Sequence, residues 1–275
     1  MSSLDAARAA DSTALRKLIA PNGAFDQIWP PALTFVVVVV AWQALIRAFE
    51  IPVYVLPAPA DIWLAFANNP HTLLSHSGIT LFEAIAGFVL GSLLGALLGT
   101  LFAYSPVIAR GFLPYIIAAN TIPVVAVAPI IIIWFGHGLG SKIAVTTFLS
   151  FFPLALNMMK GLQSYDRTVM DVFHIAAATG PQRFFKMRLP SALPYVFVGL
   201  KLNVTFSVIG AIVAEFVQAD KGLGFVIMTS YRTLAMPRLW AAMVMSALIG
   251  IVFFGLIALI ERLVVPWHTS MHDQS

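Results

Sequence analysis

The sequence predicts an all-α membrane protein with about six transmembrane helices and a cytoplasmic two-helix loop between spans four and five. Its composition is the first reason: 60% of the residues are hydrophobic, only 10% are charged, and the mean hydropathy is +0.90. Soluble domains carry about 25% charged residues, so this charge is too scarce to cover a soluble surface. The second reason is a series of apolar runs near the length of about 20 residues that a helix needs to cross the hydrocarbon. Backbone groups in lipid must bond internally, which favours helices.

Six windows approach the spanning length, and they cover residues 32–49, 79–104, 112–135, 143–159, 195–217 and 239–265. The third window is the most irregular because Pro114, Pro123 and Pro129 interrupt it. The fourth contains Pro153. Between the first two windows, Asp61 is expected to cap a short interfacial helix over residues 62–67.

The distribution of basic residues predicts which side each loop faces. With the N-terminus inside, eleven of the sixteen Lys and Arg residues fall on the cytoplasmic side, as the positive-inside rule requires. We therefore expect residues 1–29 to be a cytoplasmic segment, residues 30–265 the membrane domain, and residues 266–275 a cytoplasmic tail. This distribution accounts for the net charge of +4, so the expected surroundings are a lipid bilayer and no nucleic-acid partner is predicted.

The longest polar interval, residues 165–190, predicts two short helices joined by a sharp turn. Thr168 is expected to cap the first helix, with Asp171 three residues later in a weak capping box. Gly180 breaks that helix, and Pro181 suits the first turn of the second. Basic and aromatic side chains alternate along the second helix: Arg183, Phe184, Phe185, Lys186 and Arg188.

Span two carries a stripe of small residues headed by an acid. Gly87, Gly91, Gly95 and Gly99 recur every four residues, which predicts close packing against another helix. Glu83 lies on the same stripe. An ionisable group at that depth should face protein or water, so Glu83 either binds an ion or a polar solute group, or bonds a neighbouring helix.

Further polar residues in the spans are candidates for a solute pathway. Asn120 and Thr121 adjoin Pro123, and broken helices either border substrate sites or are simply kinked. Asn203 and Ser207 either face a polar pathway or bond a neighbouring helix. Glu215, followed by a glycine-rich turn, suggests either an outer gate or a polar helix end that reaches interfacial water.

Catalytic and metal chemistry find no support in the sequence. The segment FGHGLGSK (135–142) lacks the spacing of a phosphate-binding loop. The chain has no cysteine, and His137 has no second metal ligand nearby. His71 and His76, five residues apart in an outer loop, are expected to be solvated. No nucleophile and base are suitably arranged, so we expect neither an enzyme nor a metal site.

The interval 165–190 resembles the EAA loop of permease subunits of ATP-binding-cassette importers. Anchored on Leu189-Pro190, Met187 takes the place of the signature Ile, Ala177 that of the Gly, and Asp171 that of the Glu. The segments TLFEAIAGF (80–88), IPVVAVAPIIIIWFGHGLGSK (122–142), FFPLALNMMKGL (151–162), LPSALPYVFVGLK (189–201) and AEFVQADKGLGF (214–225) are similar to the nitrate, sulfonate, taurine and pyrimidine-precursor branch.

This resemblance implies a multi-pass permease of the bacterial inner membrane that works with a second permease copy, two ATPase subunits and an external solute-binding protein. ATP and Mg would be bound by the ATPase, with no cofactor in this chain. The implied ATPase-coupling residues are Asp171, Ala177, Thr179, Gly180, Pro181, Arg183, Phe184, Lys186 and Arg188. The expected solute is a small anion or a pyrimidine-type vitamin precursor. The alternatives are a channel or ion-coupled carrier that works without ATP, or a membrane-embedded enzyme.

Overall fold

The computed structural model describes residues 24–217 and 220–266, and within these residues the chain forms helices and no strand. They divide into two compact units, one ending at Ile51 and the other beginning at Pro52. Residues 1–23 and 267–275 lie outside the described residues, and with them most of the predicted N-terminal segment (1–29) and C-terminal tail (266–275). In the described part of the first segment, a helix has already begun at Ala24.

The first unit is represented by helix α2, Ala24–Ala48, which contains the first predicted span. Its valine run is exposed on several sides, as Val36, Val37 and Val38 are each more than half exposed. A helix that shows apolar side chains all round is suited to lipid rather than to water. The structure therefore agrees with a membrane span in this region.

The second unit contains the remaining helices in sequence order. They are α3 (Pro59–Asn68), α4 (Pro70–Tyr104), α5 (Pro106–Thr121), α6 (Val124–Phe135), α7 (Leu139–Gln163), α8 (Arg167–Ile175), α9 (Gly180–Arg183), the π-helical segment Phe184–Arg188, α10 (Leu189–Val217), α11 (Leu223–Arg232) and α12 (Met236–Val264). Counting α2, five helices among the described residues are long and apolar enough to cross a membrane, and the bent pair α5–α6 is a sixth candidate. The predicted all-α membrane fold is confirmed.

Helices α4 and α7 pack face to face along the glycine stripe. A Cβ atom added to any of the four glycines would lie closer than 3.0 Å to an atom of α7, so no side chain fits there. The contacting pairs are Gly87 with Thr146, Gly91 with Ser150, Gly95 with Phe151 and Gly99 with Ala155. Ser150 also donates its hydroxyl to the carbonyl oxygen of Gly87 at 3.0 Å. The prediction of close packing on this face is confirmed.

The order of these pairs shows that α4 and α7 run in the same direction, because residue numbers rise together along both helices. The segment between them must therefore return the chain to the side from which α4 began. At about 1.5 Å per residue, neither the 16 residues of α5 nor the 12 of α6 covers the hydrocarbon alone. The two helices bend by 104° at Ile122 and Pro123, so the third span is a broken one. Pro129 lies inside α6 and does not break it.

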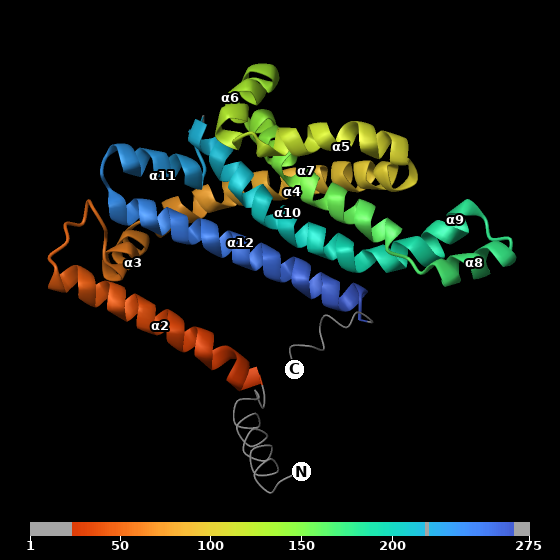
Figure 1. Ribbon diagram of the computed structural model, residues 1–275. Helices are drawn as coiled ribbons and strands as arrows, with labels where there is room; N and C mark the ends of the chain where they lie inside the picture. Colours follow the sequence, from red (N-terminus) through yellow and green to blue (C-terminus); the bar gives the residue numbers. More distant parts are fainter. Residues whose placement is uncertain (1–23, 218–219, 267–275) are drawn as a thin grey trace, which may run out of the picture. The chain divides into compact units, whose positions relative to one another are not determined.

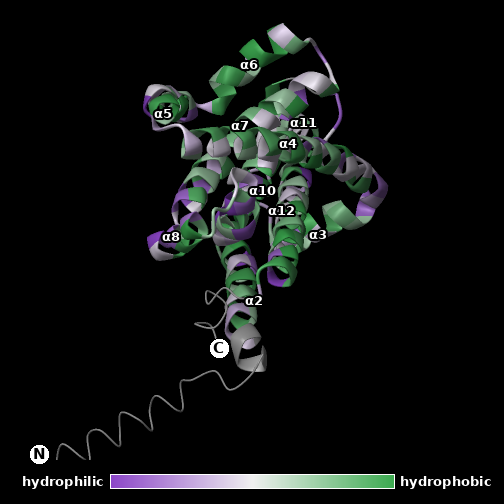
Figure 2. Cartoon of the chain, turned by 90° about the vertical axis from the view of Figure 1, so that its right-hand side faces the viewer, coloured by the Kyte–Doolittle hydropathy of each residue, from purple (hydrophilic) through white to green (hydrophobic). Residues whose placement is uncertain are grey.

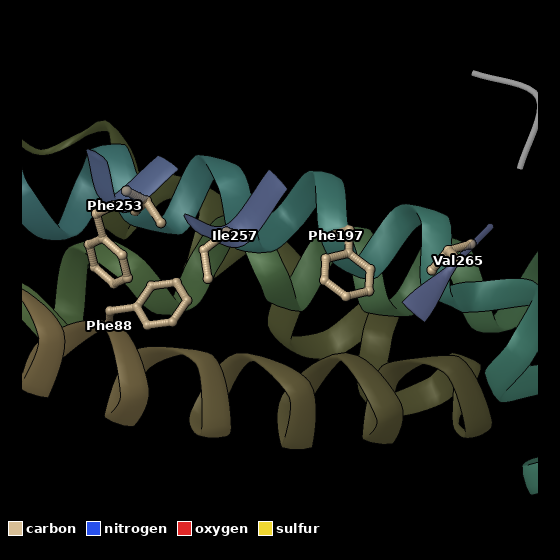
Figure 3. Packing of buried hydrophobic residues seen from close by; sticks show 6 residues of the cluster. Phe88, Phe197, Phe253, Ile257 and Val265 are labelled. Atoms are coloured by element: carbon tan, nitrogen blue, oxygen red, sulfur yellow. The ribbon is translucent and has the colours of Figure 1, made fainter. Parts of the chain in front are cut away.

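Helices α10 and α12 run in opposite directions beside α4. Lys201, near the middle of α10, forms an ion pair with Glu261, near the end of α12, with 2.8 Å between Nζ and Oε2. Figure 3 shows the apolar packing in this part of the bundle, where Phe88 of α4 meets Phe253 of α12 edge to face at 4.9 Å. The ammonium of Lys201 thus bonds a neighbouring helix.

The two ends of the bundle differ in character. Helices α8 and α9 project at one end, while α3 and α11 lie at the other (Figure 1). Apolar colouring dominates the long helices in Figure 2, and polar residues gather at α8. The interfacial helix α3 begins at Pro59, earlier than expected, and Asp61 stabilises its start by accepting the Ala58 N–H at 3.1 Å. The structure thus has two separate polar regions, one at each end of an apolar bundle.

The glycine contact predicts a sharp difference between two identical substitutions on α4. Gly91→Ala should destabilise the protein by about 1–3 kcal/mol, because the added methyl group collides with Ser150. Gly78→Ala, on the same helix with nothing within 4 Å of the added Cβ, should be neutral or stabilising by up to about 1 kcal/mol. Thermal unfolding of both variants in detergent, followed by circular dichroism, measures the difference. Equal midpoints would contradict the close packing.

Candidate functional site

The loop between α7 and α10 begins with helix α8, whose cap differs from the prediction. Asp166 is the N-cap residue, and its Oδ1 accepts the backbone N–H of Thr168 at 2.8 Å. Thr168 therefore lies within the first turn of the helix and does not cap it. Asp171 is exposed in the middle of α8, which leaves its carboxylate available to a partner. The predicted capping box is wrong because Asp166, two residues before Thr168, accepts the free backbone N–H at the start of the helix.

Helix α8 ends in a Schellman motif around Ala177. The Ala177 N–H bonds to the His174 carbonyl, and the Ala178 N–H bonds to the Phe173 carbonyl, both at 3.0 Å. Ala177 takes a φ of +50°, the left-handed conformation that this motif needs and that glycine adopts most easily. An alanine there costs about 1 kcal/mol. The turn therefore forms even though alanine stands at the position of the signature glycine.

The second helix of the loop starts as predicted but does not end where expected. Gly180 and Pro181 form the first turn of α9, and the Thr179 N–H bonds to Oε1 of Gln182 at 2.8 Å. The helix then continues through Phe184–Arg188 into α10. Pro190 lacks an N–H, and the π-helical segment just before it closes with the Leu189 N–H bonded to the Phe184 carbonyl. The two separate helices that the sequence predicts are corrected. The first is the short helix α8, and the second is the beginning of a long helix that continues into α10.

The projecting surface of this loop, which we call the elbow (residues 165–190), is partly apolar. Ile175 is 87% exposed at the turn, and Val172 of α8 and Phe185 of the π-helical segment are 59% and 64% exposed. Charged Asp171 and Lys186 are exposed in the same region. Phe184, one of the predicted coupling residues, is instead half-buried against the end of α7 and the start of α10. Exposed apolar side chains rimmed by charge are typical of a protein-binding surface.

Two of the three basic residues on the second helix are bound within the chain. Arg183 Nη1 donates to Nε2 of His174 at 2.8 Å and joins α9 to α8. The guanidinium of Arg188 lies over two tyrosine rings, with its carbon 4.8 Å from the centre of Tyr104 and 4.7 Å from that of Tyr165. Lys186 is exposed. Of the predicted basic contacts for a partner, Lys186 is thus the most accessible.

At the opposite end of the bundle, Glu83 forms a buried ion pair. Its Oε1 lies 3.0 Å from Nζ of Lys142 on α7, and the two side chains are 0% and 9% exposed. The pair lies one turn beyond the contact between Gly87 and Thr146, on the same two helix faces. Glu83 thus bonds a neighbouring helix, one of its two predicted roles. Sequence reasoning missed Lys142, although its four-residue spacing from Thr146 and Ser150 places it on the packed face of α7.

Glu215 is 1% exposed, so the expectation that it reaches interfacial water is wrong. Its Oε2 accepts the Gly224 N–H at 2.5 Å, and its Oε1 accepts the Thr80 hydroxyl at 2.7 Å. The start of α11 is completed from α4: Thr80 accepts the Leu223 N–H at 2.8 Å, and His76 Nδ1 accepts that of Gly222 at 2.9 Å.

Three successive N–H groups that a helix start leaves unpaired are therefore satisfied by side chains from other helices. A Cβ on Gly222 or Gly224 would collide with Glu215, and Gly222 also has a φ of +105°, which explains both glycines. The glycine-rich segment, expected to be a turn, opens helix α11 instead. His76, Thr80 and Glu83 follow one another at intervals of four and three residues, so they lie on one face of α4. This spacing is the sequence signal that His76 and Thr80 act together at the start of α11.

The ion pair of Glu83 and Lys142 and the α11 cap of Glu215 are neighbours along α4, because Glu83 follows Thr80, which bonds Glu215, by three residues; together they form the Glu83/Glu215 network. Glu83 and Lys142 also line a cavity of about 720 Å³ together with His137, Gly138 and Asp220. This network can hold α4, α7, α10 and α11 together at one end of the bundle, and its edge borders space open to a polar molecule.

The other pathway candidates lie apart from this network. Asn203 is fully buried and donates to the Ser92 hydroxyl at 3.1 Å, while Ser207 is fully buried and donates to the Val204 carbonyl at 2.8 Å. Asn120 and Thr121 are at the break between α5 and α6, where Thr121 is exposed. The structure brings together Glu83 and Glu215, and a solute pathway through any of the six residues stays a prediction.

The buried ion pair predicts a strong effect when one partner is removed. Lys142→Met should destabilise the protein by about 3–5 kcal/mol because it leaves the Glu83 carboxylate buried without its cation. Adding Glu83→Gln to that variant should restore part of the lost stability, because the buried carboxylate is then replaced by a neutral amide. Thermal unfolding of the two single variants and the double variant in detergent gives the interaction energy.

The half-buried pair of Lys201 and Glu261 serves as the control for this experiment, because its side chains are 24% and 17% exposed. Lys201→Met should cost about 1 kcal/mol or less. Equal costs for the two lysines, or purely additive effects at Glu83 and Lys142, would contradict a buried pair that holds the helices.

Comparisons with known proteins agree with this geometry. Residues 87–266 match the family described as the binding-protein-dependent transport system inner membrane component. The chain is 35% identical over 242 residues to the formylaminopyrimidine transport permease of Halalkalibacterium halodurans, covering 88% of this chain and 96% of the relative. It is 34% identical to the riboflavin transport system permease of Chloroflexus aurantiacus, covering 88% and 92% of the two chains. A putative aliphatic sulfonates transport permease of Bacillus subtilis is 29% identical, with 88% and 89% covered.

The family match covers well over half of the chain and contains the elbow, Lys142 and Glu215. Together with these relatives, it shows a transport subunit and not an enzyme. The chain belongs to the binding-protein-dependent transport system inner membrane component family and is a multi-pass permease of an ATP-binding-cassette importer.

Proposed function

We propose that this chain forms the solute path of an ATP-driven importer and receives its driving force from a separate ATPase that docks on the elbow. The observation that carries the proposal is the exposed apolar turn at Ile175, placed at the end of the bundle beyond the long helices. Asp171 and Lys186 flank this turn and are exposed. A surface of this kind is stabilised when a partner covers it.

The connections of the elbow suit it for transmitting force. Its first helix follows α7, and its second runs without a break into α10. A displacement of the elbow would therefore act on two spans at once. In this proposal, ATP binding closes the ATPase pair, the elbows move with it, and the spans change the side on which the path is open. ATP and Mg are held by the ATPase.

The proposed orientation places the elbow and both termini in the cytoplasm of the bacterial inner membrane. Eleven of sixteen Lys and Arg residues lie on that side in the predicted topology. Lys142, one of the five on the outer side, is neutralised inside the protein by Glu83 and therefore weighs little against this orientation. A second permease copy and an external solute-binding protein complete the proposed assembly.

For the solute, we propose a small planar heterocycle of the pyrimidine or flavin type. Support comes from the relatives at 35% and 34% identity, whose names specify formylaminopyrimidine and riboflavin, whereas the sulfonate relative is 29% identical. The paired donors and acceptors of Glu83 and Lys142 beside the outer cavity suit a neutral polar molecule better than a simple anion.

Docking of the ATPase is expected to depend on the apolar turn. Ile175→Asp should reduce binding of the purified ATPase to inside-out vesicles at least tenfold, because the charged side chain would be buried at the contact. Leu234→Asp is the matched control, since Leu234 is 60% exposed between α11 and α12 at the other end of the bundle. Binding to right-side-out vesicles, or equal binding by both variants, would contradict the proposal.

Solute class is tested by uptake into cells that express the permease with its ATPase and binding protein. Labelled formylaminopyrimidine or riboflavin should be taken up in an ATP-dependent manner. Excess taurine or nitrate should not compete, because neither has a planar ring with paired donors and acceptors. Uptake of labelled taurine that pyrimidines do not inhibit would instead assign the chain to sulfonate transport.

A further inference from the structure

The guanidinium of Arg188 connects three parts of the chain that are distant in sequence. Tyr104 is the last residue of α4, Tyr165 follows α7, and Arg188 directly precedes α10. The guanidinium carbon lies 4.8 Å from the ring centre of Tyr104 and 4.7 Å from that of Tyr165. Arg188 Nη2 also donates to the Tyr165 hydroxyl at 3.4 Å. One cation thus joins the ends of three spans on the side of the elbow.

Arginine is suited to this position by its shape as well as its charge. Its guanidinium is planar, stacks on aromatic rings and stays charged, and such cation–π contacts strengthen when the groups are shielded from water. Arg188 is half-buried, which provides part of that shielding. With its charge held by two rings, this side chain is not placed to reach a partner protein as the neighbouring exposed Lys186 is.

Aromatic and apolar contacts continue from this point into the elbow. Phe184 lies 6.4 Å from Tyr104 between ring centres, and it packs edge to face on Phe185 at 4.9 Å. Met187, at the position of the signature Ile, is buried. The second helix of the elbow is therefore fastened to α4 through both an aromatic contact and the Arg188 cation.

The first helix of the elbow is fastened in turn to the second. The bond between Arg183 and His174 spans the turn and joins α9 to α8. A continuous series of contacts therefore runs from α8 through α9 and the π-helical segment to the ends of α4 and α7. A displacement of α8 is transmitted to α4 and α7 only while every contact in this series is made.

We propose that Arg188 is a positioning residue that clamps the elbow to the ends of α4 and α7, so that these spans move with α10 when the ATPase moves the elbow. This inference rests on the proposed docking of an ATPase at the elbow. It removes Arg188 from the set of residues that contact the ATPase and gives it a role inside the permease.

The test compares Arg188→Ala with Lys186→Ala, which removes the same charge from the same helix without touching the tyrosines. Arg188→Ala should leave ATPase binding to inside-out vesicles within about twofold of the parent and lower the solute moved per ATP about tenfold. Lys186→Ala should weaken ATPase binding and leave the solute moved per ATP unchanged. Tyr165→Phe keeps the ring and should behave as the parent, whereas Tyr104→Leu with Tyr165→Leu should resemble Arg188→Ala.

A second measurement is independent of the ATPase. The chain contains no cysteine, so spin labels can be placed selectively at Val172→Cys in α8 and Leu101→Cys in α4 of the full-length permease. In lipid nanodiscs, with labelled chains diluted into unlabelled ones, they report the distance between α8 and α4 within one chain. Both positions are exposed. The parent should give a narrow distance distribution, and Arg188→Ala a broad one, with Tyr165→Phe unchanged.

The outcomes separate the two proposals. If the parent permease binds no ATPase but the distance distribution broadens in Arg188→Ala, the docking proposal fails and the clamp remains. If Arg188→Ala loses ATPase binding while its distance distribution stays narrow, Arg188 is a contact residue and the clamp is overturned. An unchanged ratio of solute to ATP in Arg188→Ala would also overturn it.

Discussion

The close contact between α4 and α7 is the constraint on which the rest of the structure depends. Four glycines on one face of α4 let the two helices approach until no side chain fits between them. Such contacts act only at short range, and in lipid they replace the hydrophobic force that packs soluble helices. Because the contact advances by about four residues on both helices, it sets their register and makes them parallel. The broken span α5–α6 follows from that direction, since the chain must cross back between two parallel helices.

The same register determines what meets at each end of the pair. One turn beyond the first glycine contact, Glu83 faces Lys142, and the neutralised pair can be buried where either charge alone would be costly. His76 and Thr80 extend this face of α4 to the start of α11, which Glu215 completes from α10. At the other end of α4, Tyr104 meets Arg188. Both polar regions are therefore held by side chains of α4, the helix with the bare glycine face.

The two ends suit different tasks in an importer permease. The network around Glu83 and Glu215 consists of short, directed bonds among four helices, and it gives a firm end beside a polar cavity. The elbow carries exposed apolar side chains at its turn, such as Ile175, whereas Phe184, where the elbow joins the bundle, packs against α7 and α10. Ala177 shows how the turn is maintained: the Schellman motif imposes a left-handed residue, and alanine accepts that conformation at a small cost. The contact surface is thus presented by a backbone motif and does not depend on the glycine itself.

Residue patterns alone predict the membrane class, the spans, the break near Pro123, the packed glycine face and the position of the elbow. These features depend on local composition and on the spacing of residues within one helix, which a sequence displays directly. It did not determine the cap of α8 at Asp166, the continuity of α9 with α10, or the helix that follows the glycines at 222 and 224. The partners of the polar residues become visible only in the folded chain: Lys142 for Glu83, the start of α11 for Glu215, and two tyrosines for Arg188. Those pairings join residues 9 to 84 positions apart, and they exist because helix packing, which no local pattern encodes, brings their helices to the same place.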